Sequence, residues 1–339
     1  MFLSIPWSPL AAVLFGGAFS YFIVIPVFQY FYDAKNLRQY PNQNVLSGVT
    51  NLALVWESFG NFRTEKLYEA HKKHPIIRTG PTSLSFRDPA AIKDIYGHSS
   101  PFRKADNYAA LHSPYSNMLT VVDKPDHARK RKMLSNAFAT RNLVTWEYKV
   151  VDKVQRLLDQ FDKAHITAKR NGSAWAIVDY QWWANLFTVA AICDIGLSHD
   201  TTMLETGTDV ITINNDNGDV VQRNFIKGMH AKNRPGSIFI WATVWNKTLR
   251  NIAHYTSSWF RKMDHEADKF REVLRYMART RIERHKREEK LDDFFHSLME
   301  NQHGSLHNLD MGEMIAETSV ICKMKPKLLK SSVLQFWLT

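Results

Sequence analysis

The longest apolar stretch of the chain covers residues 10–32, LAAVLFGGAFSYFIVIPVFQYFY, in which Gln29 is the most polar side chain. About 20 consecutive apolar residues are enough for a helix to cross a bilayer. The first cations, Lys35 and Arg38, come after this stretch, so the positive-inside rule places the rest of the chain in the cytoplasm. We therefore expect a single-pass transmembrane anchor behind a lumenal segment, residues 1–9. The alternative is a buried core helix.

The rest of the pattern predicts a mainly α-helical domain with a small β-sheet. We expect a polar hinge at residues 33–59 and the folded domain at 60–321. Within that domain, residues 200–235 are polar, with a turn cluster at 214–218. Two short strands should flank Gly80-Pro81, because this dipeptide is a strong turn signal. Apolar side chains recur at helical spacing in most other elements. The predicted strands are 76–79 and 83–86, and the predicted helices are 60–74, 89–96, 123–139, 146–168, 178–197, 237–259, 261–290, 292–299 and 309–321.

Four segments depart from the simple amphipathic pattern. Residues 178–197 are apolar nearly all round, which indicates a central buried helix. Residues 261–290 carry 11 Lys/Arg against 7 Asp/Glu, which is typical of a long, solvated helix. Residues 98–122 are expected to form a long loop, and loops of this length are often functional or mobile. The last segment, residues 322–339, has four Lys and no acid, and we predict that it is an aberrant tail.

One helix, residues 123–139, carries the most informative constellation. His127, Arg131, Leu134 and Phe138 occur at i, i+4, i+7 and i+11, which places them on one helix face. The face is apolar at its C-terminal end, so we expect it to point toward the core. An unpaired buried charge is very costly. The guanidinium group of Arg131 therefore requires an anion.

The chain is basic, with a formal net charge of +11. Three cations of the same helix, Arg129, Lys130 and Lys132, are expected to point away from the apolar face. A balance of this kind fits a solvated surface, an anionic membrane surface or an acidic protein partner. Nucleic-acid binding is not expected, because the sequence contains no zinc finger and no basic module interleaved with aromatic residues.

Other sites are weakly indicated. The two cysteines, Cys193 and Cys322, point to neither a disulfide framework nor a zinc site made from Cys alone, and Cys193 is expected to be a small buried hydrophobe. The sequence contains no Gly-rich phosphate loop and no H-E-x-x-H motif. His71 and His74 are i, i+3 neighbours, and we expect a solvated pair rather than metal ligands.

Several segments occur in an order that resembles the cytochrome P-450 family of haem-thiolate monooxygenases, most of all its membrane-anchored fungal members of benzoate-hydroxylase type. In that family, the residues at the positions of His127 and Arg131 bind the haem propionates. This chain has His where Trp is frequent, and the substitution keeps a hydrogen-bond donor. The matching segments are Leu37–Asn44 (LRQYPNQN), His74–Gly97, His127 with Arg131, Ala137-Phe138, and Ile192–Leu197.

The resemblance implies the N-terminal two-thirds of the P-450 fold behind a single transmembrane helix in the endoplasmic reticulum membrane. It implies a haem cofactor, electrons from an NADPH-dependent reductase, and insertion of oxygen into a small apolar or aromatic organic substrate, in secondary metabolism or xenobiotic oxidation. Phe102 and Lys104 are expected near the haem edge or the substrate. The basic residues near Arg129 are expected to dock an acidic reductase.

The resemblance also has a gap. The family's axial thiolate sits in a Phe-x-x-Gly-x-x-x-Cys-x-Gly loop, and neither Cys193 nor Cys322 has those neighbours. We therefore expect no metal ligand and no catalytic residue in this truncated chain, which is predicted not to retain haem and to be inactive alone. The alternatives are a non-catalytic, membrane-tethered helical remnant, a defective gene model, and a basic protein that binds membrane surfaces or nucleic acid.

Overall fold

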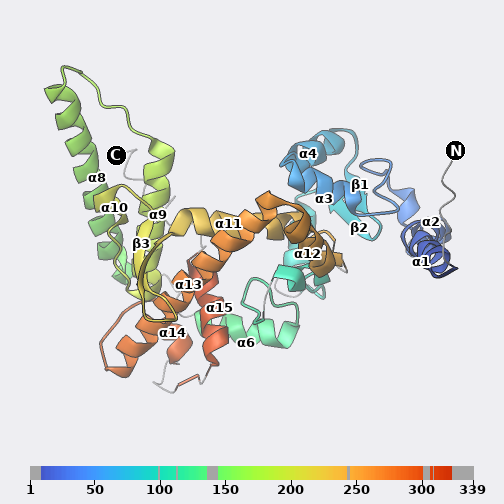
Figure 1. Ribbon diagram of the computed structural model, residues 1–339. Coiled ribbons are helices and arrows are strands. Elements are labelled where there is room, and N and C mark those ends of the chain that lie inside the picture. Colours follow the sequence, from blue (N-terminus) through green and yellow to red (C-terminus); the bar gives the residue numbers. More distant parts are fainter. Residues whose placement is uncertain are drawn as a thin grey trace. The chain divides into compact units, whose positions relative to one another are not determined.

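The computed structural model describes residues 9–97, 100–111, 114–135, 144–242, 245–300, 306–307 and 309–322. Helices dominate these residues (Figure 1). They form two compact units, the first from Met1–Phe102 and Ser237–Leu249, the second from Arg103–Gly236 and Arg250–Thr339. The dipeptide Ala137-Phe138 and the predicted tail beyond Cys322 lie outside the described residues.

The first unit begins with a long apolar helix, which confirms the element expected at residues 10–32. It runs through α1 (Pro9–Phe19), the π-helical turn η1 (Ser20–Val24) and α2 (Ile25–Tyr32). By length and composition, Phe15–Tyr32 is long and apolar enough to cross a membrane, and none of this window is buried. The ring of Trp245 contacts this helix, with centroids 5.6 Å from Tyr21 and 5.1 Å from Phe22.

Short helices and one hairpin complete the first unit. The expected strand pair is confirmed: β1 (Ile76–Gly80) and β2 (Ser83–Phe86) are antiparallel, with Ile77 opposite Ser85. The helix expected at 60–74 is confirmed as one helix at Arg63–Lys73. The segment expected to be a polar hinge, 33–59, contains a further helix at Leu52–Phe59, and Gly60 and Asn61 separate the two, with a positive φ of 63° at Asn61. The helices of this part are η2 (Leu37–Gln39), α3 (Leu52–Phe59), α4 (Arg63–Lys73) and α5 (Ala90–Tyr96).

The expectation of a solvated histidine pair in this unit is wrong for one partner. His71 is 9% exposed, and its Nε2 lies 2.8 Å from the Ser85 hydroxyl while Nδ1 lies 3.0 Å from the His74 carbonyl oxygen. Both ring nitrogens thus have polar partners, which is what burial of an imidazole requires. His71 joins α4 to β2, and His74 is exposed.

The second unit holds the larger core. Its elements are η3 (Asp106–Leu111), α6 (Lys124–Ser135), α8 (Glu147–Arg170), α9 (Tyr180–Leu197), α10 (Met203–Thr206), β3 (Val210–Asn214), β4 (Val220–Asn224), α13 (Ser258–Lys286), α14 (His296–Met299) and α15 (Met311–Ile321). Two further helices, α11 (Phe225–Phe239) and α12 (Asn246–Thr256), each include residues assigned to both units. Helices α8 and α9 lie side by side (Figure 1).

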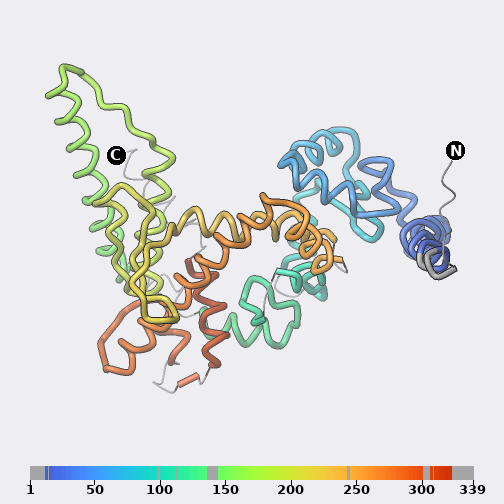
Figure 2. Tube along the Cα trace, in the orientation of Figure 1, coloured from blue at the N-terminus to red at the C-terminus, as the bar shows by residue number. Residues whose placement is uncertain are grey.

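The polar segment 200–235 contains a β-hairpin, whose turn falls in the turn cluster expected at 214–218. Strands β3 and β4 pair in register from Val210 opposite Asn224 to Asn214 opposite Val220. Ile211 and Ile213 point inward from β3 and are buried, while their neighbours are more exposed. The hairpin lies against α13 (Figure 2), where Arg223 Nε donates to Glu272 at 2.8 Å.

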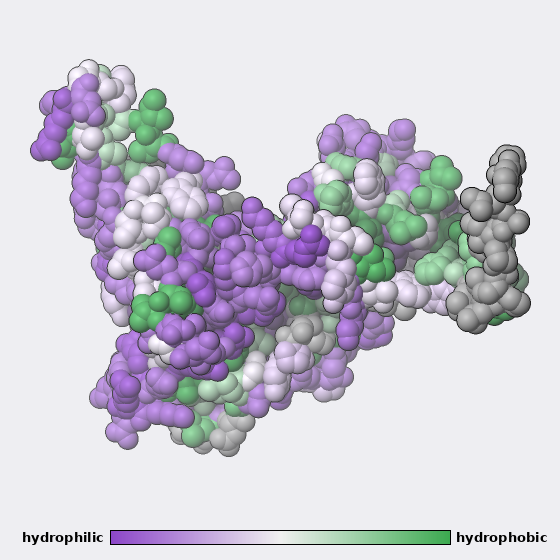
Figure 3. All heavy atoms as spheres, viewed as in Figure 1, coloured by the Kyte–Doolittle hydropathy of each residue, from purple (hydrophilic) through white to green (hydrophobic). Residues whose placement is uncertain are grey.

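Helix α13 corrects a second expectation, because it is a core helix rather than a solvated one. Figure 3 shows hydrophilic side chains over the face of α11 and α13 that is in view, in agreement with the charge count. That count averages over all faces of a helix, whereas burial follows a stripe at i, i+3, i+4 and i+7. The stripe is Phe270, Val273, Leu274 and Met277, each at most 1% exposed.

Helix α9 is buried along its second half, as its apolar sequence predicted. It begins where the Asp179 carboxylate accepts a hydrogen bond from the Trp182 amide at 3.0 Å, and its core stretch starts at Leu186, which is fully buried. Near its end Gly196 faces α15, and a Cβ atom there would collide with the side chain of Ile321. This glycine therefore lets α9 and α15 approach closely.

Candidate functional site

Helix α6 begins within the polar segment Asp123–Asp126 and presents its cations on two different faces. The Asp123 carboxylate accepts from the Asp126 amide at 2.9 Å, which caps the first turn. His127 is half-buried, whereas Arg131 is exposed. The expectation that Arg131 faces the core is therefore wrong, and burial of its charge no longer requires an anion. Its role toward a propionate stays a prediction that rests on the family resemblance.

The buried face of α6 belongs to Lys130, Met133 and Leu134. These residues share a face because they are three and four positions apart. Lys130 was expected to point away from the apolar face, but it lies on the buried face and its side chain is 1% exposed. The buried face of α6 is therefore displaced by one position from the face that the spacing of His127 and Arg131 predicted. The apolar side chains of Met133 and Leu134 together determine which side of the helix packs on the core.

Lys130 is buried because two carboxylates of α15 receive it. Its ammonium group donates to Glu317 at 3.1 Å and also to Glu313, and Arg129 pairs with Glu313 as well. Burial opposes the ionisation of Glu313, but the hydrogen bonds from Lys130 and Arg129 outweigh it and lower the pKa of that carboxyl. This cluster joins α6 to α15.

Glu317 also holds the segment before α6. Its carboxylate accepts from the Met118 amide at 3.0 Å, while burial, opposed by that bond and by Lys130, raises its pKa. The neighbouring Asn117 side chain donates to the Ala316 carbonyl at 3.4 Å. Helix α15 therefore fixes both α6 and the segment at residues 117–118.

A group of three cationic or basic side chains forms where this segment meets α6. Lys104 Nζ donates to the carbonyls of Met118 and Leu119 at 2.7 and 2.9 Å. Burial lowers the pKa of His127, and the nearby charges of Lys104 and Arg131 lower it further. His127 is thus within electrostatic reach of both Lys104 and Arg131. The expectation that Lys104 lies near the haem edge or the substrate stays a prediction.

The donors of this group fit an anionic ligand. Among the described residues, the guanidinium group of Arg131 has no hydrogen bond or ion pair, and the imidazole of His127 has no hydrogen bond. Asp126 offsets part of the charge near His127, and Glu317 offsets part of the charge of Lys104. An Arg fork and an imidazole are suited to carboxylates, because charge-assisted hydrogen bonds are the stronger ones. Haem propionates are carboxylates of this kind.

The two cysteines lie elsewhere in the second unit, in its hydrophobic core. Cys193 of α9 is fully buried and Cys322 is 3% exposed. A hydrogen bond with Cys322, together with burial, raises the pKa of the Cys193 thiol. A raised pKa keeps a thiol protonated, and a thiol must lose its proton to bind a metal. The expectation that Cys193 is a buried hydrophobe is confirmed.

Comparison with known proteins identifies a matching family and several similar proteins. The cytochrome P450 family model matches residues 48–323. Benzoate 4-monooxygenase bphA of Aspergillus niger is 27% identical over 165 residues, which are 48% of this chain and 32% of that protein. Cytochrome P450 monooxygenase atnE of Emericella nidulans is 28% identical over 161 residues, or 46% of this chain and 31% of that protein.

The fold of this chain is also similar to that of a solved structure. The structure described as retinoic acid bound cyanobacterial CYP120A1 superimposes with a TM-score of 0.52 at 13% identity, covering 83% of this chain and 56% of that one. The matched regions of the two fungal relatives amount to about a third of their length. The helical fold with small antiparallel sheets is thereby confirmed, and with the match over residues 48–323 the chain belongs to the cytochrome P450 family.

Proposed function

We propose that this chain supplies the propionate-binding side of the haem site of a membrane-anchored monooxygenase. The observation that carries the proposal is the group formed by His127, Arg131 and Lys104, in which Arg131 has no partner among the described residues. His127 and Arg131 would donate to the propionates and thus orient the haem plane against α6. When bound with a thiolate ligand, haem supplies oxygen activation.

Residues around the site determine how firmly it is held. Lys130 and Glu317 fix α6 to α15 through a buried ion pair, so the first turns of α6 cannot shift without separating these charges. Lys104 is held by two carbonyl oxygens, and its ammonium group adds positive charge near His127. Together these contacts preorganise the donors before any ligand arrives.

We further propose that neither cysteine of this chain is the axial ligand, so the chain does not catalyse oxygen insertion by itself. Both thiols are buried in the core, and the raised pKa of Cys193 disfavours the thiolate. In the sequence neither cysteine lies in a Phe-x-x-Gly-x-x-x-Cys-x-Gly loop. The chain would then contribute to binding and positioning, with no catalytic residue of its own.

For the substrate, partner and membrane, the proposal follows the relatives. The name benzoate 4-monooxygenase supports a small aromatic or otherwise apolar organic substrate. An NADPH-dependent reductase would deliver the electrons, and Lys132, an exposed cation of α6 without a partner among the described residues, would contribute to its docking. The helix through Phe15–Tyr32 would anchor the chain in the endoplasmic reticulum membrane, with the bulk of the chain in the cytoplasm.

Haem titration of the full chain in detergent tests the donors. Arg131→Ala and His127→Ala should each weaken haem binding, measured from the Soret absorbance, because each removes a donor to a carboxylate. A hydrogen bond to a charged group contributes about 1.5–3 kcal/mol, so Arg131→Ala should lower the affinity at least about tenfold. Lys132→Ala is the matched control, because it removes a cation from an exposed position of the same helix.

Two results would contradict the proposal. Equal haem affinity of the wild type, Arg131→Ala and His127→Ala would remove these residues from the site. A thiolate-type Soret band in the reduced, CO-treated wild-type chain would show that one of its own cysteines binds the iron. In that case Cys193→Ser and Cys322→Ser would identify which one.

A further inference from the structure

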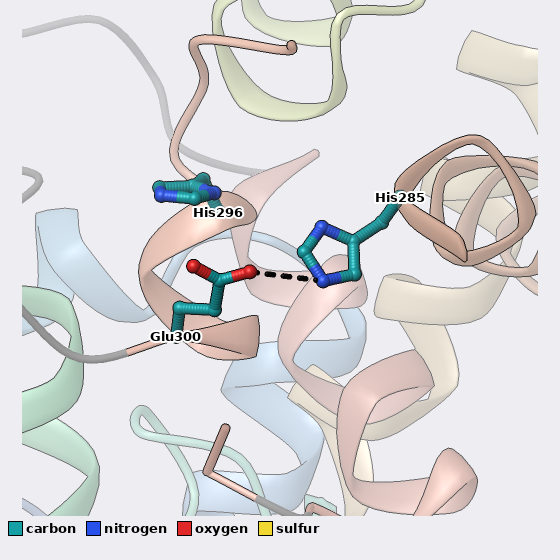
Figure 4. Close-up of side chains that lie close together, drawn as sticks. All are labelled: His285, His296 and Glu300. Atoms are coloured by element: carbon teal, nitrogen blue, oxygen red, sulfur yellow. Dashed lines mark ion pairs between the residues drawn. The ribbon is translucent and has the colours of Figure 1, made fainter. Parts of the chain in front are cut away.

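Three side chains with metal-ligating atoms meet at the end of α13, away from the propionate site. His285 comes from the last turn of α13, His296 begins α14, and Glu300 follows α14 (Figure 4). One ligand atom from each lies within 4.8 Å of the other two. His285 Nε2 and Glu300 Oε1 are the nearest pair, 3.1 Å apart.

We propose that His285, His296 and Glu300 bind a divalent transition-metal ion of the Zn²⁺ class. Two imidazoles and one carboxylate are a donor set that suits Zn²⁺ and related ions, whereas Mg²⁺ and Ca²⁺ prefer oxygen ligands alone. Ligand atoms about 2.1 Å from a tetrahedral ion lie about 3.4 Å from one another. The pair formed by His285 and Glu300 already has nearly this separation, and His296 is exposed and can rotate to approach it.

A buried ion pair next to the site holds the two helices that carry the ligands. Arg281 Nε and Nη2 donate to the two carboxylate oxygens of Asp293 at 2.7 and 3.1 Å, and both side chains are at most 1% exposed. Arg281 is one turn before His285 on α13. The same Asp293 carboxylate accepts from the His296 amide at 2.9 Å, so it also fixes the start of α14.

The proposed ion would have an accessible entry and an open coordination position. The side chains of His285 and Glu300 are 19% and 23% exposed, and His296 is more exposed than either. Three protein ligands leave a fourth position for water. The ion would join the end of α13 to the segment from α14 to Glu300, and its effect would appear as added stability of the second unit.

Zinc binding to the full chain in detergent, free of any histidine tag, tests the site. The wild type should bind one Zn²⁺ ion at this site more tightly than its other histidines bind Zn²⁺. The double variant His285→Gln/His296→Gln measures the Zn²⁺ affinity of those other histidines. His296→Gln should weaken that binding more than about tenfold by titration calorimetry. Zn²⁺ should raise the melting temperature of the wild type, and Mg²⁺ at the same concentration should not.

His296→Gln separates metal binding from folding. The His296 side chain is exposed and makes no hydrogen bond with the described residues, so the substitution should leave the melting temperature without metal unchanged and abolish the rise caused by Zn²⁺. His165→Gln, on the exposed face of α8, should keep both the Zn²⁺ affinity of the wild type and the rise in melting temperature caused by Zn²⁺. Equal Zn²⁺ affinity in the wild type and the double variant would overturn the proposal and leave His285 and Glu300 as an ion pair only.

Discussion

The ammonium group of Lys130 lies 3.1 Å from the carboxylate of Glu317, and each side chain is 1% exposed. This pair joins α6, which carries His127 and Arg131, the proposed propionate donors, to α15. Removal of one member of a buried pair leaves the other charge uncompensated, and the cost is usually about 3–5 kcal/mol. The relationship therefore connects the stability of the second unit to the position of His127 and Arg131.

Lys130→Met should lower the free energy of unfolding by about 3–5 kcal/mol, measured by urea denaturation of the full chain in detergent. Adding Glu317→Gln should recover part of the loss, because the amide carries no charge and still accepts from the Met118 amide. Lys132→Met, at an exposed position of the same helix, should change stability by less than about 0.5 kcal/mol. Strictly additive effects of Lys130→Met and Glu317→Gln would show that the two groups do not interact.

The pair formed by Arg281 and Asp293 allows a comparison of buried and exposed ion pairs within one helix. Asp293→Asn should lower the free energy of unfolding by about 3 kcal/mol or more, because it leaves Arg281 buried without its counter-ion. Asp216 pairs with Arg279 of the same helix, but these side chains are 46% and 49% exposed. Asp216→Asn should therefore cost less than about 1 kcal/mol.

Denaturation of both variants under one set of conditions measures this difference. Losses of equal size would contradict the assignment of Asp293 as a buried anchor. Asp293→Asn should also reduce zinc affinity, because Asp293 fixes the start of α14 and thus His296. Asp216→Asn should leave zinc affinity unchanged.

The sequence predicted the elements whose signals are local. The hairpin around Gly80-Pro81, the mostly apolar helix expected at 178–197 and the apolar N-terminal helix all depend on neighbouring residues, and all three are present. Apolar and polar side chains also alternate along residues 210–214, but the surrounding polar residues obscured this short pattern. Strand β3 is defined by its partner β4 and by packing on α13, which a window of sequence does not contain.

The site was predictable only in part, for a related reason. The spacing of His127 and Arg131 predicted two donors, whose role toward a propionate stays a prediction, and Lys104 was expected near the haem edge or the substrate. The burial of Lys130 was missed, because its two carboxylate partners are 183 and 187 residues further along the chain. The cluster of His285, His296 and Glu300 was missed as well, since the return of α14 toward α13 is a tertiary feature.

His199 should make the second unit less stable in mild acid. Burial lowers the pKa of His199, and the nearby charge of Arg284 lowers it further, while Asp200 and Asp194 act in the opposite direction. The unfolded chain, with a pKa near 6.5, then binds more protons than the folded chain between the lowered pKa and 6.5. Stability from this group is present above pH 6.5 and is lost as the pH falls through the folded pKa.

Urea denaturation at pH 7 and pH 5 tests this dependence. The wild type should lose more stability between these pH values than His199→Gln, whose side chain does not titrate. His165→Gln is the control, because His165 is exposed and its replacement should leave the wild-type slope intact. An identical loss in the wild type and in His199→Gln would exclude His199 as the source.

The exposed turn after α8 reports on which side of the membrane the second unit lies. Asn171, Gly172 and Ser173 form a glycosylation sequence, all three residues are exposed, and Gly172 has a positive φ of 79°. An exposed sequence of this kind is accessible to the glycosylation machinery in the lumen. If the helix through Phe15–Tyr32 anchors the chain with its bulk in the cytoplasm, Asn171 should remain unmodified.

Endoglycosidase treatment of chain expressed in a eukaryotic host should therefore leave its gel mobility unchanged, and Asn171→Gln should migrate like the wild type. A matched control replaces residues 1–32 with a cleavable secretion signal, which sends the same turn into the lumen. That chain should be glycosylated, and Asn171→Gln in the same background should lose the modification at this position. Glycosylation of Asn171 in the wild type would place the second unit in the lumen, away from a cytoplasmic reductase.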